Sequence, residues 1–246
     1  MSAKLHHTVL PIDAVAATSA ATGYPASNLL TPSVGKPWRS TSTSGQNIDI
    51  DLGTARTAPV IGIQGANAAS CTLSYGSTGY TDTSAGTQTL SLDRHGRRKA
   101  SLALAGSVRY IRLVFGAAAP DDGAAYFQLG ALHIFGSTLT LAEAPLIGSD
   151  TAGNFPQTRI DLPNGNAFAI DRGSAWQRIT LRFRPLRTVD MEEVQRKARA
   201  ATCWLDLDDT ASRELQWPVR SIEGEQGRSL ARALQDELSI VLREVA

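Results

Sequence analysis

The sequence predicts a mainly β protein made of two β-rich parts. Three observations lead to this fold class: short runs in which apolar and polar residues alternate, clusters of Gly, Asn, Asp and Ser between these runs, and a change in charge density after Gly136. The chain has 246 residues, of which 42% are hydrophobic. That length and composition suffice for the cores of two modest domains.

Residues 1–136 contain short strand-like runs and no long run with a helical period. The clearest alternation lies in the run 109–115, where Ile111, Leu113 and Phe115 fall on one face and Tyr110, Arg112 and Val114 on the other. The predicted strands are 47–52, 60–64, 71–75, 87–92, 99–104, 110–115 and 131–135. Many short strands separated by turns are typical of a sandwich or a barrel.

Charge density marks a boundary. Residues 1–136 carry ten basic and seven acidic residues, whereas the remaining 110 carry fourteen basic and sixteen acidic ones. A shift of this size predicts two domains of different character. We place the first at 1–136, a connecting segment with Pro145 and Gly148 at 137–153, and the second at 154–246.

The second part predicts more strands and one helix. An Asn164-Gly165 turn between alternating runs is a strong hairpin signal. The predicted strands are 158–162, 167–171, 176–183, 203–207, 214–219 and 220–225. The helix spans about 188–201, with Thr188 or Asp190 as its N-cap. Residues 232–245 fit either a helix or a strand, and we favour a strand over 237–243 because the hairpin sheet needs a partner.

Several function classes are disfavoured. A net charge of +1 argues against a dedicated nucleic-acid binder, and no apolar stretch is long enough to span a bilayer. Cys71 and Cys203 are expected to be free buried thiols. His6 and His7 are interpreted as a solvated end, His133 as a strand residue, and no histidine pair has zinc spacing. No nucleophile or phosphate-loop motif is present, so we expect neither a cofactor nor an enzyme.

Several segments in order resemble a discoidin-like domain of the coagulation factor 5/8 type C family. They are Ala26-Ser27-Asn28-Leu29-Leu30, Trp38-Arg39-Ser40, the runs 48–53, 60–63 and 73–77, and the strands 108–115 and 129–136. The resemblance implies a galactose-binding-like jelly-roll sandwich whose ligand contacts come from loops at one end. By position, the implied glycan- or partner-binding residues are Arg39, Asn67, Tyr80 and Tyr126, while Trp38 is expected in the core. The loop 31–37 offers no carboxylate for calcium, so no metal is expected.

Residues 140–246 resemble the ring-forming domain of phage distal tail proteins, in the order hairpin, long strand, helix and final strand. The resemblance implies a homo-oligomeric ring, with six copies favoured, in a virion tail tip or baseplate assembled from protein made in the host cytoplasm. Tail-tube, hub and fibre proteins would be its neighbours. Arginine pairs well with carboxylates across repeated interfaces. The expected inter-subunit residues are Arg178, Arg182, Arg184, Glu192 and Glu193.

The sequence thus predicts a structural phage-tail component whose first domain projects towards a protein partner or a host surface glycan. The alternative is a carbohydrate-binding lectin, or an accessory module of a polysaccharide-degrading enzyme. Neither reading involves nucleic acid or a membrane span.

Overall fold

A computed structural model describes the first part of the chain almost continuously and the second part as separate stretches. The described residues are 4–31, 35–57, 59–92, 98–117, 119–140, 146–147, 153–154, 157–161, 167–171, 176–183, 196–197, 203–206, 216–221 and 238–244. After residue 140, side chains are described at five positions only: Arg196, Lys197, Cys203, Trp204 and Asp206.

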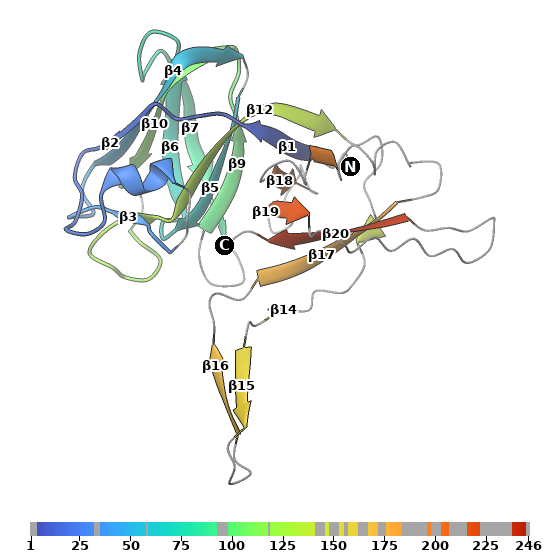
Figure 1. Cartoon of the computed structure of the whole chain (residues 1–246). Coiled ribbons are helices and arrows are strands. Elements are labelled where there is room, and N and C mark those ends of the chain that lie inside the picture. The colour runs from blue at the N-terminus through green and yellow to red at the C-terminus, as the bar shows by residue number, and fades with distance from the viewer. Residues whose placement is uncertain are drawn as a thin grey trace.

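The protein is mainly β, as predicted, and its first part is a sandwich of two antiparallel sheets (Figure 1). One sheet has the order β2 (Ala14–Ala17), β4 (Gln46–Thr57), β10 (Ser107–Phe115), β6 (Ser70–Gly76) and β7 (Thr83–Thr89). The facing strands are, in order, β1 (Lys4–Val9), β12 (Ala131–Thr140), β5 (Val60–Ala66), β9 (Arg98–Ala103) and β8 (Ser91–Leu92).

The core between these sheets follows the alternation read from the sequence. Ile111, Leu113 and Phe115 of β10 are fully buried, while the intervening side chains are half-exposed. On the facing sheet Ile61 and Ile63 of β5 are also fully buried. Burial of such side chains contributes roughly 1.5–3 kcal/mol each to folding. Six of the seven strands predicted in the first part are therefore confirmed, with shifts in their ends. The seventh, 87–92, is divided between the end of β7 in one sheet and β8 in the other.

Four strands of the first part were not predicted, namely β1, β2 and the two-residue strands β3 (Trp38–Arg39) and β11 (Gln128–Leu129). The first of them corrects an interpretation. His6 and His7 are not a solvated end, because both are buried in β1, 5% and 8% exposed. The reason is pairing on both sides: β1 lies between β12 and β18 (Cys203–Asp206). His133 is also buried, in β12. The second unpredicted strand is β2, which pairs with the edge of β4.

The second part continues the same sheet. From β18, which pairs with β1, the order runs through β19 (Gln216–Ser221), β20 (Leu238–Glu244) and β17 (Trp176–Phe183). The short strands β13 (Leu146–Ile147) and β14 (Gly153–Asn154) both pair with β17. Strand β12 runs past Gly136 to Thr140, so strand pairing extends into the segment expected to be a connection.

Most of the predicted strands of the second part are present. The hairpin of β15 (Gln157–Asp161) and β16 (Ala167–Asp171) is confirmed and projects away from the two sheets (Figure 1). The final segment is a strand, as favoured. The segments predicted at 214–219 and 220–225 form one strand, β19. Of the predicted helix 188–201, residues 196–197 are helical and the rest lies outside the described residues.

Tryptophan 204 joins the two parts through side-chain packing. Its ring is fully buried and clusters with Val60 and Phe135 of the first part. A Cβ atom built on Gly62 would lie 2.7 Å from Cε3 of Trp204, so the ring occupies the space that a side chain would need. We call this cluster of Val60, Phe135 and Trp204, with the adjacent His6 and His133, the seam. Both histidine rings lie close to Phe135, with centroids 6.5 and 5.9 Å away.

Candidate functional site

A two-stranded ribbon at one end of the sandwich carries the first candidate residue. It pairs β3 (Trp38–Arg39) with β11 (Gln128–Leu129). Trp38 is fully buried, as predicted, and its indole N–H donates to the Ser19 carbonyl at 2.9 Å. Its ring packs against Phe115 with centroids 6.2 Å apart. Because neighbouring side chains on a strand point to opposite faces, the burial of Trp38 turns Arg39 outward.

Arg39 is held by two tyrosine rings and one amide. Its Cζ lies 4.1 Å from the ring centroid of Tyr24 and 5.0 Å from that of Tyr126. Its Nε donates to Oε1 of Gln128 at 2.9 Å. All four side chains are half-exposed. We call Tyr24, Arg39, Tyr126 and Gln128 the loop cluster; cation–π contacts of this kind contribute about 0.5–2 kcal/mol each.

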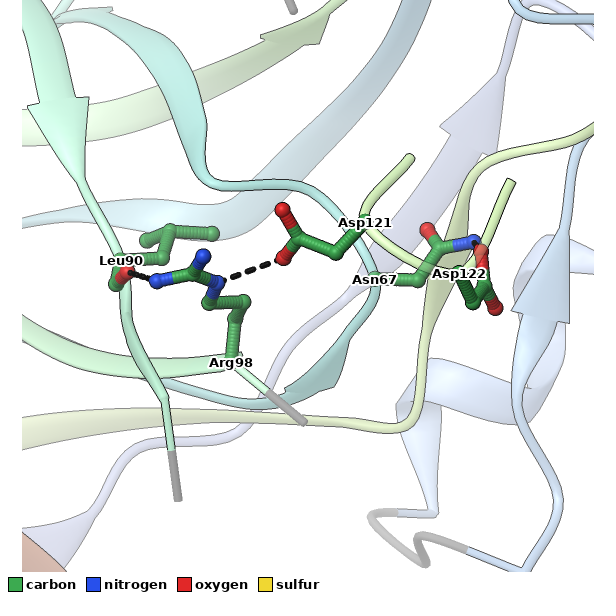
Figure 2. Close-up of polar contacts among 5 residues, drawn as sticks. All are labelled: Asn67, Leu90, Arg98, Asp121 and Asp122. Atoms are coloured by element: carbon green, nitrogen blue, oxygen red, sulfur yellow. Dashed lines mark hydrogen bonds and ion pairs between the residues drawn. The ribbon is translucent and has the colours of Figure 1, made fainter. Parts of the chain in front are cut away.

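Asn67 lies behind the loop cluster and fixes its backbone. Its Nδ2 donates to the Tyr126 carbonyl at 3.0 Å and to Oδ1 of Asp122 at 3.3 Å, and its Oδ1 accepts from the Gln128 N–H at 2.8 Å. The side chain is 9% exposed. Asn67 is therefore a positioning residue for Tyr126 and Gln128. Figure 2 shows it beside Asp122.

A neighbouring ion pair anchors the same loop (Figure 2). Nε of Arg98 lies 2.6 Å from Oδ2 of Asp121, and its Nη1 donates to the Leu90 carbonyl at 3.0 Å. The Asp121 N–H also donates to the Asn67 carbonyl at 2.7 Å. The loop that carries Tyr126 is thus tied to β9 and to the residue after β5, which keeps Tyr126 in place against Arg39.

Tyr80, the fourth candidate, lies elsewhere. Its ring centroid is 5.0 Å from that of Tyr110, and Cζ of Arg112 is 5.2 Å from it. On β10, Tyr110 precedes Phe115 by five positions, on the order of 17 Å along a strand. Phe115 is the residue that packs beneath the loop cluster, against Trp38 and Phe127. The structure thus brings Arg39, Asn67 and Tyr126 together and separates Tyr80 from them.

The surroundings of Tyr80 form a second group, the sheet cluster, in which the arginines have carboxylate partners. Arg112 binds both oxygens of Asp49, at 2.6 and 2.7 Å, and Arg109 binds both oxygens of Asp51, at 2.9 and 3.1 Å. Hydrogen bonding from Arg109 lowers the pKa of Asp51. Burial, with the nearby charges of Asp49 and Asp51, raises the pKa of Tyr80.

The Tyr80 loop is shaped by Asp82. One carboxylate oxygen, Oδ2, accepts from the Thr78 N–H at 2.9 Å, the Thr78 hydroxyl at 2.8 Å and the Gly79 N–H at 2.9 Å. These hydrogen bonds, led by that from the Thr78 backbone, lower the pKa of Asp82. The loop is therefore ordered by local polar contacts rather than by core packing.

Two members of the loop cluster, Tyr24 and Gln128, were not predicted from the sequence. Tyr24 lies between Gly23 and Pro25, a turn context that could have marked it as a loop aromatic. Gln128 follows the buried Phe127 and carries no such signal.

The expected inter-subunit residues are not tested. Arg178 and Arg182 lie on β17, where the backbone alone is described, and Arg184, Glu192 and Glu193 lie outside the described residues. The predicted ring contacts therefore stay a prediction.

Within the described stretches, no group of three or more His, Cys, Asp or Glu side chains could hold a metal ion. Cys71 and Cys203 are buried and form no disulfide, as predicted. Burial raises the pKa of each thiol to about 12. The same described stretches contain no helix with the length and apolar character of a membrane span.

The chain has distant likenesses among solved structures. No family model matches the chain, and no curated protein matches it. Among solved structures, chitosan-binding module 1 from a chitosanase/glucanase of Paenibacillus sp. IK-5 is 19% identical, with a TM-score of 0.40 over 53% of this chain and 100% of that one. The family 32 carbohydrate-binding module of C. perfringens NanJ, solved with galactose, is 15% identical, with a TM-score of 0.41 over 52% and 98%.

A larger solved chain, truncated AlyQ with its CBM32 and alginate lyase domains, is 22% identical. Its TM-score is 0.41, over 73% of this chain and 48% of that chain. Each of these three solved chains contains a carbohydrate-binding module. Likenesses this distant do not extend to ligand or activity, so the function has to be argued from the clusters themselves.

Proposed function

We propose that the chain is a carbohydrate-binding protein and that the loop cluster contacts the sugar. The observation that carries this is Arg39, held half-exposed against Tyr24 and Tyr126 by ring contacts and by Gln128. Sugar recognition uses aromatic surface for the C–H face of the ring and a few fixed polar groups for its hydroxyls. The loop cluster offers both within one group of contacting side chains.

The loop cluster is also restrained before any ligand arrives. An arginine side chain that is free in solution loses up to about 2 kcal/mol of rotamer entropy when it is fixed. Here the two rings and the Gln128 amide restrain Arg39, and Asn67 fixes the backbone of Tyr126 and Gln128. Pre-organised contacts improve affinity by lowering this ordering cost.

The sheet cluster supports sugar binding less well. Its two arginines already have bidentate carboxylate partners, and the Tyr80 ring is tilted by 60° against Tyr110. These contacts satisfy the groups that a sugar hydroxyl would need. Tail-tip assembly stays a prediction, because the residues on which it depends have no described side chains.

A glycan array probed with the full chain tests the proposal. We expect binding to at least one glycan, weakened in Arg39→Gln and retained in Arg112→Gln. Both variants remove one guanidinium, and thermal unfolding of each shows whether it is folded. If no glycan is bound by the folded wild-type chain, or if Arg39→Gln binds as the wild type does, the proposal fails.

A further inference from the structure

We propose that the sugar recognised by the loop cluster carries a carboxylate, as a uronic acid does, and that Arg39 selects it. This inference rests on the proposed function and names the class of its ligand. It follows from the charge balance around Arg39, which differs from that of the other arginines that contact tyrosine rings.

Arg39 is the arginine of the two clusters whose charge is not balanced by a described carboxylate. Arg109 and Arg112, in the sheet cluster, each contact an aspartate, with Nε to oxygen distances of 2.9 and 2.6 Å. Arg98, beside the loop cluster, contacts Asp121 at 2.6 Å. In the part of the chain that the structure describes, the polar partner of Arg39 is the neutral amide of Gln128. The positive charge of Arg39 therefore remains available to an incoming anion.

The remaining donors of Arg39 suit a carboxylate in particular. A guanidinium has five N–H donors, and the contact with Gln128 uses the one on Nε. The four N–H bonds of its two terminal nitrogens remain for an end-on pair with the two oxygens of a carboxylate. The side-on pair that Arg112 makes with Asp49, through Nε and Nη2, is closed to Arg39 because Gln128 occupies its Nε. Stacking against Tyr24 and Tyr126 holds the guanidinium in position for the end-on pair.

One nearby carboxylate opposes this preference and supplies a matched control. Oδ1 of Asp122 accepts from Asn67 and from the Ala124 N–H at 3.1 Å, and no described cation pairs with it. Asp121, its neighbour, is already balanced by Arg98. Asp122 therefore repels an anionic ligand of the loop cluster, to a degree set by distance and salt. Neutralising it should strengthen the binding of an acidic sugar and leave a neutral one unaffected.

The test compares oligouronides with their own methyl esters, which share the sugar skeleton and lack the charge. Trimers of galacturonate, glucuronate and mannuronate are titrated into the full chain by calorimetry at low and at high salt. For the best-bound trimer we expect the acid to bind about tenfold tighter than the ester at low salt, with a smaller ratio at high salt. Arg39→Gln should abolish the preference for the acid over the ester. Arg39→Lys should keep part of this preference, and Arg112→Gln should leave it unchanged.

Asp122→Asn should raise the affinity for the acid about two- to threefold and leave that for the ester unchanged. Equal binding of acid and ester, binding of neutral array glycans alone, or an acid preference that survives Arg39→Gln would each overturn this inference while leaving sugar binding intact. Absence of binding to every array glycan and every trimer would overturn both the inference and the proposed function.

Discussion

The loop cluster and the seam are both built on strands of the sandwich, yet their polar side chains differ in exposure and in charge. In the loop cluster a charged arginine is half-exposed, and its aromatic neighbours leave its terminal nitrogens available. In the seam His6 and His133 are buried around Phe135, and burial lowers the pKa of each to about 4. The loop cluster therefore keeps a charged side chain at the surface, whereas the seam keeps its two histidines uncharged at neutral pH.

This difference indicates that the seam stabilises the folded chain and that the loop cluster binds the ligand. The seam is buried, with Trp204 filling the space above Gly62. Removing atoms there costs packing energy. The loop cluster contributes little buried area of its own, so its side chains can serve a ligand. If the two regions have these separate roles, stability and ligand binding should change independently of each other.

The largest effect of a single substitution is expected from truncating the seam. Trp204→Ala should lower the free energy of unfolding by about 3–5 kcal/mol, because it empties a fully buried site. Denaturant unfolding of the full chain measures this. Glycan affinity of the folded variant should match that of the wild type, and a loss of affinity without unfolding would show that the two regions are coupled.

Acidification should weaken the seam next. The pKa of His6 and of His133 is about 4 in the folded chain and about 6.5 when unfolded, so the unfolded state binds more protons between these values. The stabilisation is complete above pH 6.5 and is lost as the pH falls towards 4, on the order of 3 kcal/mol for each histidine. Denaturant unfolding at several pH values measures the slope of the free energy of unfolding against pH. His133→Gln should flatten it, and an unchanged slope would contradict the account.

A smaller effect should follow from crowding the seam. Gly62→Ala places a methyl group 2.7 Å from Cε3 and 3.0 Å from Cζ3 of Trp204, and the buried ring has little room to shift. We expect a loss of about 1–3 kcal/mol. The same substitution in a Trp204→Ala background should cost less, because the space is then free. Equal costs in both backgrounds would mean that Trp204 does not pack on Gly62.

The two buried tryptophans sharpen the comparison further. The Trp38 indole donates to Ser19, whereas Nε1 of Trp204 is buried without a hydrogen-bond partner among the described residues. Trp38→Phe should therefore cost about 1–2 kcal/mol more than Trp204→Phe, since it breaks a hydrogen bond and leaves a carbonyl unpaired. Paired thermal unfolding curves measure the difference in stability. A larger loss of stability in Trp204→Phe would contradict the view that only the Trp38 indole has a hydrogen-bond partner among the described residues.

Local sequence patterns predicted most of the strands. The strands that were missed depend on pairing with segments far away in the sequence. The alternation at Ile111, Leu113 and Phe115 and the Asn164-Gly165 turn were sufficient for their elements. Strand β1 was missed because its hydrogen-bonding neighbours are remote; His6 and Thr138 are 132 positions apart. No local pattern shows that a histidine pair near the start of the chain will lie between two distant strands.

The candidate site was predicted in part for the same reason. Arg39, Asn67 and Tyr126 were named, and the structure places them together. Tyr80 was grouped with them because all four lie in loops or next to them. Asn67 precedes β6 and Tyr80 follows it, so their loops lie at opposite ends of that strand, a consequence that the grouping by loop position overlooked. Tyr24 and Gln128 join Arg39 through β3–β11 pairing, which neither short run predicted.

The most direct test of the central claim is a side-by-side titration of Tyr126→Ala and Tyr80→Ala with the best array glycan. Each variant removes one half-exposed tyrosine ring that contacts an arginine, so they differ mainly in which cluster is changed. Our account predicts that Tyr126→Ala weakens binding at least about tenfold, or 1.4 kcal/mol, while Tyr80→Ala binds like the wild type. Retained binding in Tyr126→Ala together with lost binding in Tyr80→Ala would contradict it.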